Sequence, residues 1–348
     1  MGLTEGTVTG ETARTALARA SLFLGWGPLV ALVPLSLLLS SIPDTYRYLP
    51  LVASVVVFGM PHGAVDYIAL PRARHGGVDI RGIAVVSVVY LVLGAAYLGL
   101  WVVAPVPAAV GFIALTWFHW GQGELYVLRG LFAVDHVDDF TQQVLTVVVR
   151  GGLPMLVPLF GFPGRYREVV GTFVEPFGGT TASWWIFHAW PRFVLMAAFG
   201  LVTILTLARG WTRATDRRGW RLDAFECGLL WVVFMTVPPV LAVGVYFCLW
   251  HSVRHIIRVM LLDRWSVDAI AEHRFGRALG KFGVEAAVPT VLALAFAAAL
   301  LWQTGVSASN LSGATGLYLV AIAVLTLPHT VVVVLMDREQ RIWNFPAT

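Results

Sequence analysis

Long stretches without charge are the feature that most constrains this chain. Asp, Glu, Lys and Arg are absent from 20–43, 48–65, 82–123, 227–253 and 286–336. Because roughly 20 apolar residues of helix cross a hydrocarbon core about 30 Å thick, each stretch is long enough for at least one span. Only 13% of the residues are charged, about half of the usual fraction for a soluble domain. We therefore predict an all-α, polytopic integral membrane protein and exclude a soluble enzyme, a disordered chain and a nucleic-acid binder.

Breaks in the apolar sequence and the placement of arginine set the expected number of spans. Proline and polar segments divide the longest stretches at 104–107, at Pro238-Pro239 and at 303–313, and weaker spans cover about 140–160 and 192–208. Arginines gather in 72–81, 209–221 and 264–277, which the positive-inside rule places in the cytoplasm. The pattern predicts about ten transmembrane helices, within a range of 8–10, and both termini in the cytoplasm.

The expected organisation is a single membrane domain. We expect 1–19 to be a cytoplasmic N-terminal segment, 20–337 the helical membrane domain and 338–348 a cytoplasmic tail. The aromatic loop 161–190, with Trp184, Trp185 and Trp190, is expected outside. Cys227 and Cys248 lie in apolar sequence, so no disulfide framework is indicated. The expected location is the cell membrane, as a multi-pass protein.

Five of the nine histidines lie in the expected membrane spans, where ionisable groups are rare and usually functional. They are His62, His119, His251, His255 and His329. On each of four separate helices, an imidazole lies roughly 14–15 Å along the helix from the first arginine at its cytoplasmic end. A neutral imidazole bonded between helices explains any single one equally well. The common depth of the set, however, predicts a shared metal site inside the single domain.

The spacing of these histidines indicates the ligand set. His251 and His255 are four residues apart and so project from one helix face, as a bidentate pair must. With His62 and His119 at matching depth they form an all-imidazole site, and His329 is an additional candidate. Imidazole suits zinc, copper, iron or nickel. Four neutral ligands leave a divalent ion its full charge and open positions, which favours oxygen activation over structural tethering.

Neighbouring residues supply candidate supporting groups. Asp66, four residues after His62, is placed to accept an imidazole N–H or to pair with Arg254, although it equally well marks a helix end. Gln122 follows His119 by three residues and has a similar position. Small and aromatic residues beside the histidines suggest a tunnel for a long apolar substrate, with ordinary helix packing as the alternative: Gly63, Trp117, Trp120, Gly121, Phe247 and Trp250.

Four short motifs carry a resemblance to a known family. In order along 48–337, the chain reads Pro61-His62-Gly63-Ala64-Val65-Asp66, His119-Trp120-Gly121, Trp250-His251-Ser252-Val253-Arg254-His255 and Pro328-His329. This order resembles the Brp/Blh family of β-carotene 15,15′-dioxygenases, membrane proteins made of helices.

The resemblance implies oxygen-dependent cleavage of the central 15,15′ double bond of β-carotene to two all-trans-retinal. It implies a non-haem Fe(2+) held by His62, His119, His251 and His255, while His329 matches a family motif without an equally clear ligand role. Glu124 lies at a position where the resemblance leads us to expect an acidic residue, although Asp is the commoner residue there. The implied partners are β-carotene and O2, the lipid bilayer and, functionally, a retinal-binding opsin.

Other classes of membrane protein remain as alternatives. Another membrane metallo-oxygenase acting on a lipid, such as a two-iron desaturase, needs about eight histidines in several clusters, and this chain has one His-x-x-x-His pair. An intramembrane zinc protease needs His-Glu-x-x-His, which is absent. A metal or proton transporter usually adds intramembrane carboxylates along a path, whereas Asp66 is nearly alone here.

Overall fold

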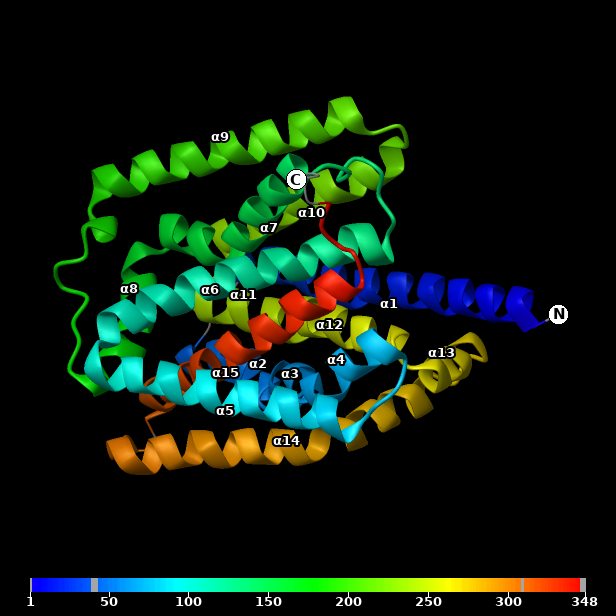
Figure 1. Ribbon diagram of the computed structural model, residues 1–348. Coiled ribbons are helices and arrows are strands. Elements are labelled where there is room, and N and C mark those ends of the chain that lie inside the picture. The colour runs from blue at the N-terminus through cyan, green and yellow to red at the C-terminus, as the bar shows by residue number, and fades with distance from the viewer. Residues whose placement is uncertain (1, 39–42, 308–309, 345–348) are drawn as a thin grey trace.

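The computed structural model describes residues 2–38, 43–307 and 310–344 (Figure 1). Within these residues every regular element is helical, which confirms the predicted all-α class. The long helices are α1 (Gly2–Leu38), α5 (Ile80–Val103), α6 (Pro105–Tyr126), α7 (Phe140–Gly161), α9 (Ala189–Arg213), α10 (Arg217–Thr236), α14 (Phe275–Thr304) and α15 (Leu311–Glu339). The shorter ones are α2 (Asp44–Ser54), α3 (Gly59–Ala64), α4 (Asp66–His75), α8 (Pro163–Val174), α11 (Pro239–Val245), α12 (Ser252–Leu261) and α13 (Arg264–Ala271).

Eight segments of the described chain are long and apolar enough to cross a membrane, within the predicted range of 8–10. They are Thr9–Leu38, Tyr46–His75, Ile80–Val103, Phe140–Gly161, Ala189–Arg213, Pro239–Leu261, Phe275–Thr304 and Leu311–Glu339. The remaining two expected spans correspond to α6 and α10, which are less apolar: α6 ends with Gln122 and Glu124, and α10 begins with several charged residues. The cytoplasmic location of both termini stays a prediction.

The predicted breaks between helices are confirmed where prolines dictate them. Helix α5 ends at Val103 and α6 begins at Pro105, because the residue before a proline disfavours the helical conformation and proline is well suited to the first helical position. Likewise α10 ends at Thr236 and α11 begins at Pro239.

The expected domain boundaries stay predictions. The boundary at residue 19 falls inside the continuous helix α1, and α15 ends close to the boundary expected at 337. The aromatic loop 161–190 contains α8 and two short 3-10 turns. Residue 1 of the expected N-terminal segment, residues 39–42 of the first apolar stretch, 308–309 of the polar break and 345–348 of the expected tail lie outside the described residues.

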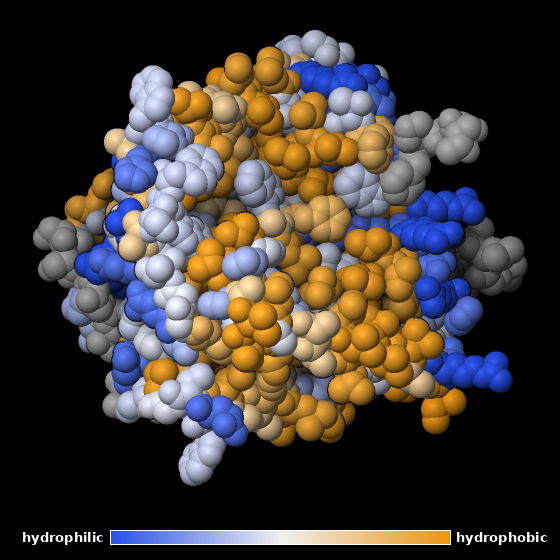
Figure 2. All heavy atoms as spheres, turned by 60° about the vertical axis from the view of Figure 1, so that its left-hand side comes forward, coloured by the Kyte–Doolittle hydropathy of each residue, from blue (hydrophilic) through white to orange (hydrophobic). Residues whose placement is uncertain are grey.

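Burial separates an inner group of helices from an outer one. In the apolar core of the span Pro239–Leu261, 83% of the residues are buried, against 17% in α5 and in α14. In Figure 1 α9 and α14 lie at opposite edges of the bundle, with α6, α11, α12 and α15 between them. Figure 2 shows broad apolar areas on the surface, as expected for helices that face lipid rather than water. The inner helices are the ones that carry the intramembrane histidines.

Candidate metal centre

Helix α3, which carries His62, is a short element between two breaks. Residues 55–58 interrupt the span after α2, and α4 starts again at Asp66. A Cβ atom at Gly59 would lie 2.5 Å from the carbonyl oxygen of Ser54, so only glycine fits this close approach. The Nδ1 of His62 donates to the carbonyl oxygen of Gly59. This bond fixes the tautomer and leaves the Nε2 of His62 without its proton, as a ligand nitrogen must be.

A π-helical turn positions the histidine pair. Residues Tyr246–His251 form this wider turn between α11 and α12, and α12 carries His255. Such turns are rare and occur frequently at functional sites. The Nε2 atom of His251 lies 3.2 Å from the Nε2 atom of His119 on α6.

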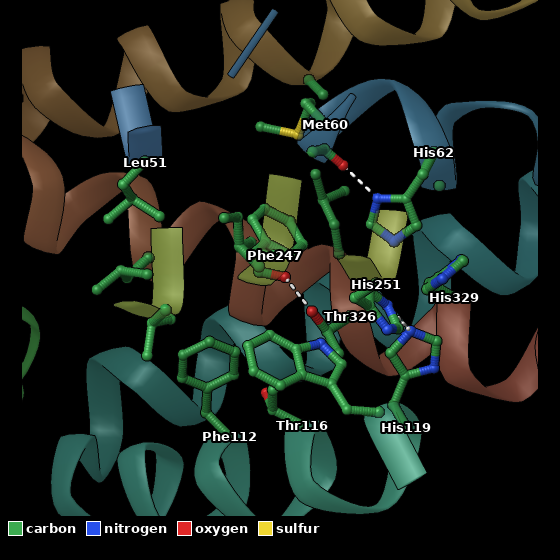
Figure 3. Close-up of a pocket in the computed structure, with 18 of the residues that line it drawn as sticks. Leu51, Met60, His62, Phe112, Thr116, His119, Phe247, His251, Thr326 and His329 are labelled. Atoms are coloured by element: carbon green, nitrogen blue, oxygen red, sulfur yellow. Dashed lines mark hydrogen bonds between the residues drawn. The ribbon is translucent and has the colours of Figure 1, made fainter. Parts of the chain in front are cut away.

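The five intramembrane histidines converge on one buried cluster (Figure 3 shows four of them). The ring centroid of His62 lies 5.3 Å from that of His251, 5.4 Å from that of His255 and 5.1 Å from that of His329. The rings of His119 and His329 are 4.6 Å apart, and those of His255 and His329 are 5.0 Å apart. The predicted convergence of histidines from four helical segments is therefore observed, although most of them are far apart in the sequence.

Asp66 supports the cluster through His329. Its Oδ2 atom accepts from the Nδ1 of His329 at 2.7 Å and from the hydroxyl of Tyr90 on α5 at 2.6 Å. The sequence suggested His62 or Arg254 as its partner, because it assumed one continuous helix through His62 and Asp66. The break between α3 and α4 removes that common face. Tyr90 was not found from sequence, because a lone tyrosine in an apolar span carries no signal.

Gln122 belongs to a polar group with Asp337 and Arg258. Its amide donates to Asp337 at 2.7 Å, and Asp337 also pairs with Arg258 at 2.7 Å. Gln122 therefore fastens α6 to the end of α15 rather than orienting His119, contrary to the role expected for it.

Arg254 and Glu124 lie in a buried network of ion pairs behind the histidine pair. Glu124 accepts from Arg254 at 2.7 Å, from Arg150 at 3.0 Å and from the indole of Trp250 at 3.0 Å. Arg150 also pairs with Glu226 at 2.7 Å and with Asp223 at 2.6 Å. The sequence suggested Asp66 as a partner of Arg254 and gave no sign of Arg150, Asp223 and Glu226, which are contributed by α7 and α10. The network holds α12, and with it His255, against α6, α7 and α10.

A cavity of about 610 Å³ lies against the histidine cluster, and most of its lining is apolar. His62, His119, His251 and His329 contribute to its wall, as do three of the expected tunnel residues, Gly63, Trp120 and Phe247. Figure 3 shows Leu51 and Phe112 at the left, away from His329, and Phe247 between them and the histidines.

The other three expected tunnel residues have different surroundings. Trp117 donates to the carbonyl oxygen of Val148 at 2.8 Å, and Trp250 donates to Glu124. A Cβ atom at Gly121 would lie 2.1 Å from the carbonyl oxygen of Val147. Gly121 therefore allows α6 and α7 to pack in close contact, which is the alternative role that the sequence left open.

The donor atoms fit a metal ion. Two nitrogens that are each about 2.1 Å from one metal, at angles between 90° and 109°, lie about 3.0–3.4 Å apart, as the Nε2 atoms of His119 and His251 do. The Nε2 atoms of His255 and His329 are buried and have no hydrogen-bond partner among the described residues. Potential ligand atoms lie within 4.8 Å of one another in two groups, one of His62, His119 and His251 and the other of Asp66, His255 and His329. Buried groups without partners are costly, and a bound cation would satisfy them.

Fold and site together define a polytopic helical membrane protein with a buried histidine centre suited to a metal ion. The model of the family described as beta-carotene 15,15'-dioxygenase matches residues 53–337, and the chain belongs to this family. It is 51% identical to the probable beta-carotene 15,15'-dioxygenase Blh of Halobacterium salinarum, covering 94% of this chain and 95% of that protein. It is 29% identical to the probable beta-carotene 15,15'-dioxygenase Brp of the same species, covering 84% of each chain. No solved structure matches.

Proposed function

We propose that this protein uses O2 to cleave the central 15,15′ double bond of β-carotene, giving two all-trans-retinal, at a non-haem Fe(2+) centre in the cell membrane. The observation that carries the proposal is the convergence of five buried imidazoles beside an apolar cavity, in a chain of the dioxygenase family. The lipid bilayer supplies β-carotene, and a retinal-binding opsin is the functional partner that would take up the product.

The proposed iron ligands are His62, His119, His251 and His255, with His329 as a further ligand. His329 is added because its Nδ1–H is held by Asp66, so that its Nε2 carries no proton and has no other partner among the described residues. A carboxylate that accepts the second N–H of a histidine is typical of metal ligands, whose ring it orients. When bound, ferrous iron would supply the position at which O2 is activated.

The cavity accounts for the choice of an apolar substrate. β-Carotene is a hydrocarbon without polar groups, so van der Waals contacts with a cavity of complementary shape, and not hydrogen bonds, must hold it. Trp120 and Phe247 line the cavity beside His251, and their rings are stacked with centroids 6.2 Å apart. Such flat apolar walls suit a planar polyene and exclude water from the histidine centre.

The test is a pigment assay in a bacterial host that accumulates β-carotene. Expression of the chain should remove the orange colour and produce retinal, whereas His119→Ala should leave the pigment intact. His188→Ala is the matched control, because His188 is exposed and lies outside the cluster, and it should behave as the parent. Unchanged β-carotene on expression of the parent, with folded protein present in the membrane, would refute the proposal.

A further inference from the structure

The cavity beside the histidines reaches the surface of the bundle between α5 and α14. Almost all of the residues that line it are buried or half-buried, but Ser87 on α5 and Leu292 on α14 are exposed. The side chain of Leu292 has 65% of its surface exposed. Both helices belong to the outer, apolar group that is long enough to cross a membrane. The opening therefore lies between two helices that face lipid.

Helix α15 forms the inner wall of this opening. Both α5 and α14 pack against α15, and between them α15 contributes Ile322, Leu325, Thr326 and His329 to the cavity. Thr326 donates its hydroxyl to Ile322 within the helix, and Ser87 does the same to Ile83. Because neither hydroxyl is left free, the path from the surface to His329 is effectively apolar.

Contacts close the gap between α5 and α14 at both ends. At the arginine-rich end, Pro289 has no N–H for the carbonyl of Glu285, and Tyr67 donates to that carbonyl at 3.0 Å instead. The Glu285 carboxylate also accepts from Arg72 at 2.7 Å, which ties α4 to α14. At the opposite end, Trp101 of α5 and Leu300 of α14 belong to one buried cluster with α15.

The depth and surroundings of the opening fit a ligand that is dissolved in lipid. Ser87 is six residues from Arg81, and Leu292 is seven from Glu285, so they lie about 9–11 Å inside the charged end of their helices. Neighbouring side chains on the same helices are exposed and apolar, including Val88, Leu91, Val288 and Val291. At this depth the opening lies in the hydrocarbon part of the leaflet on the arginine-rich side.

We propose that this opening, the α5–α14 portal (Ser87, Pro289 and Leu292, with Ile322 and Leu325 behind them), is where a long apolar polyene passes from the bilayer to the histidine centre. The polyene slides along α15 towards His329 and leaves the hydrocarbon of the membrane without crossing water. This inference rests on the proposed function, since it identifies the route taken by the substrate of that same site.

The test blocks the portal reversibly. Cys227 and Cys248 are buried, so a cysteine introduced by Ser87→Cys is the accessible thiol in the full-length protein held in lipid nanodiscs. A bulky, apolar thiosulfonate reagent should reduce the rate of β-carotene cleavage at least tenfold, and a reductant should restore it. When Ser87→Cys is loaded with β-carotene first and labelled afterwards, a single turnover should proceed at the same rate as in the unlabelled variant. Leu91→Cys, exposed on the same helix and outside the cavity lining, should be labelled equally and keep its rate.

Each outcome decides between the portal and the proposed function. Full activity of labelled Ser87→Cys would overturn the portal while leaving the cleavage activity in place. Equal loss in labelled Leu91→Cys would also overturn it, because the reagent would then act through general damage. Absence of cleavage in the unmodified parent would contradict the proposed function itself. As a second variant, Leu292→Trp should slow multiple turnover and leave the metal content unchanged, with Val291→Trp as its exposed neighbour for comparison.

Discussion

Replacing Asp66 by Asn tests whether this carboxylate orients a metal ligand. The Oδ2 atom of Asp66 accepts from His329 at 2.7 Å and from Tyr90 at 2.6 Å. Asparagine has the same shape and can still accept one hydrogen bond, but it no longer provides the charge that strengthens His329 as a ligand. Loss of such a partner typically lowers metal affinity 10–100-fold, which corresponds to about 1.4–2.7 kcal/mol.

The assay measures iron retained per chain against a chelator of known affinity. Asp66→Asn should release its iron at about 10–100-fold lower chelator concentration than the parent. Tyr90→Phe should have a smaller effect in the same direction, because Asp66 keeps its bond to His329. Asp79→Asn is the matched control: Asp79 is exposed and caps α5, and asparagine caps a helix about as well. A parent-like affinity in folded Asp66→Asn would refute the reasoning.

Four further changes have outcomes that follow from the packing. Gly121→Ala should prevent stable folding, seen as aggregation on detergent extraction, because its Cβ would lie 2.1 Å from the backbone of α7. Gly63→Ala should fold and bind metal, because its Cβ would lie 3.4 Å from His329. Arg150→Met should destabilise the protein by about 3–5 kcal/mol, measured as a lower thermal unfolding midpoint. Glu124 and Glu226 would then share Arg254 as their remaining arginine, and Asp223 would keep His136 but no arginine. An unchanged midpoint would contradict this. The thermal unfolding midpoint of Arg150→Lys should lie between those of the parent and Arg150→Met, because lysine keeps the charge but cannot pair with several carboxylates at once.

The sequence predicted the helical class and the helix breaks because these depend on local chemistry. Helices begin at Pro105 and at Pro239 because proline suits the first turn of a helix and restricts the residue before it. The depth of the histidines was also readable, since a helix has a fixed rise per residue. The common depth was enough to predict that His62, His119, His251, His255 and His329 meet.

The partners of the polar residues were not readable from sequence. Asp66 and His329 are separated by 263 residues, and the break between α3 and α4 turned Asp66 away from the face on which the sequence placed it. The carboxylates that balance Arg254 come from α6 and α10, and the second arginine of the network, Arg150, comes from α7. A regular helical pattern also gives no sign of the π-helical turn at Tyr246–His251. Such features depend on which helices become neighbours.

Tunnel and packing residues were likewise indistinguishable in the sequence. Gly63 and Gly121 both stand next to a histidine, yet one lines the cavity and the other meets the backbone of α7. Trp120 and Trp117 lie on one helix, and only Trp120 contributes to the cavity wall. The distinction depends on the direction from which α7 approaches α6.

The central claim, that the histidine centre is an iron centre that cleaves β-carotene, is tested most directly by metal content and product formation in the same purified sample. The protein should contain about one iron per chain, and its rate of retinal formation should rise and fall with that content. Chelation should remove iron and activity together, and Fe(2+) should restore both. Stoichiometric zinc or copper that supports cleavage, while iron does not, would contradict the claim.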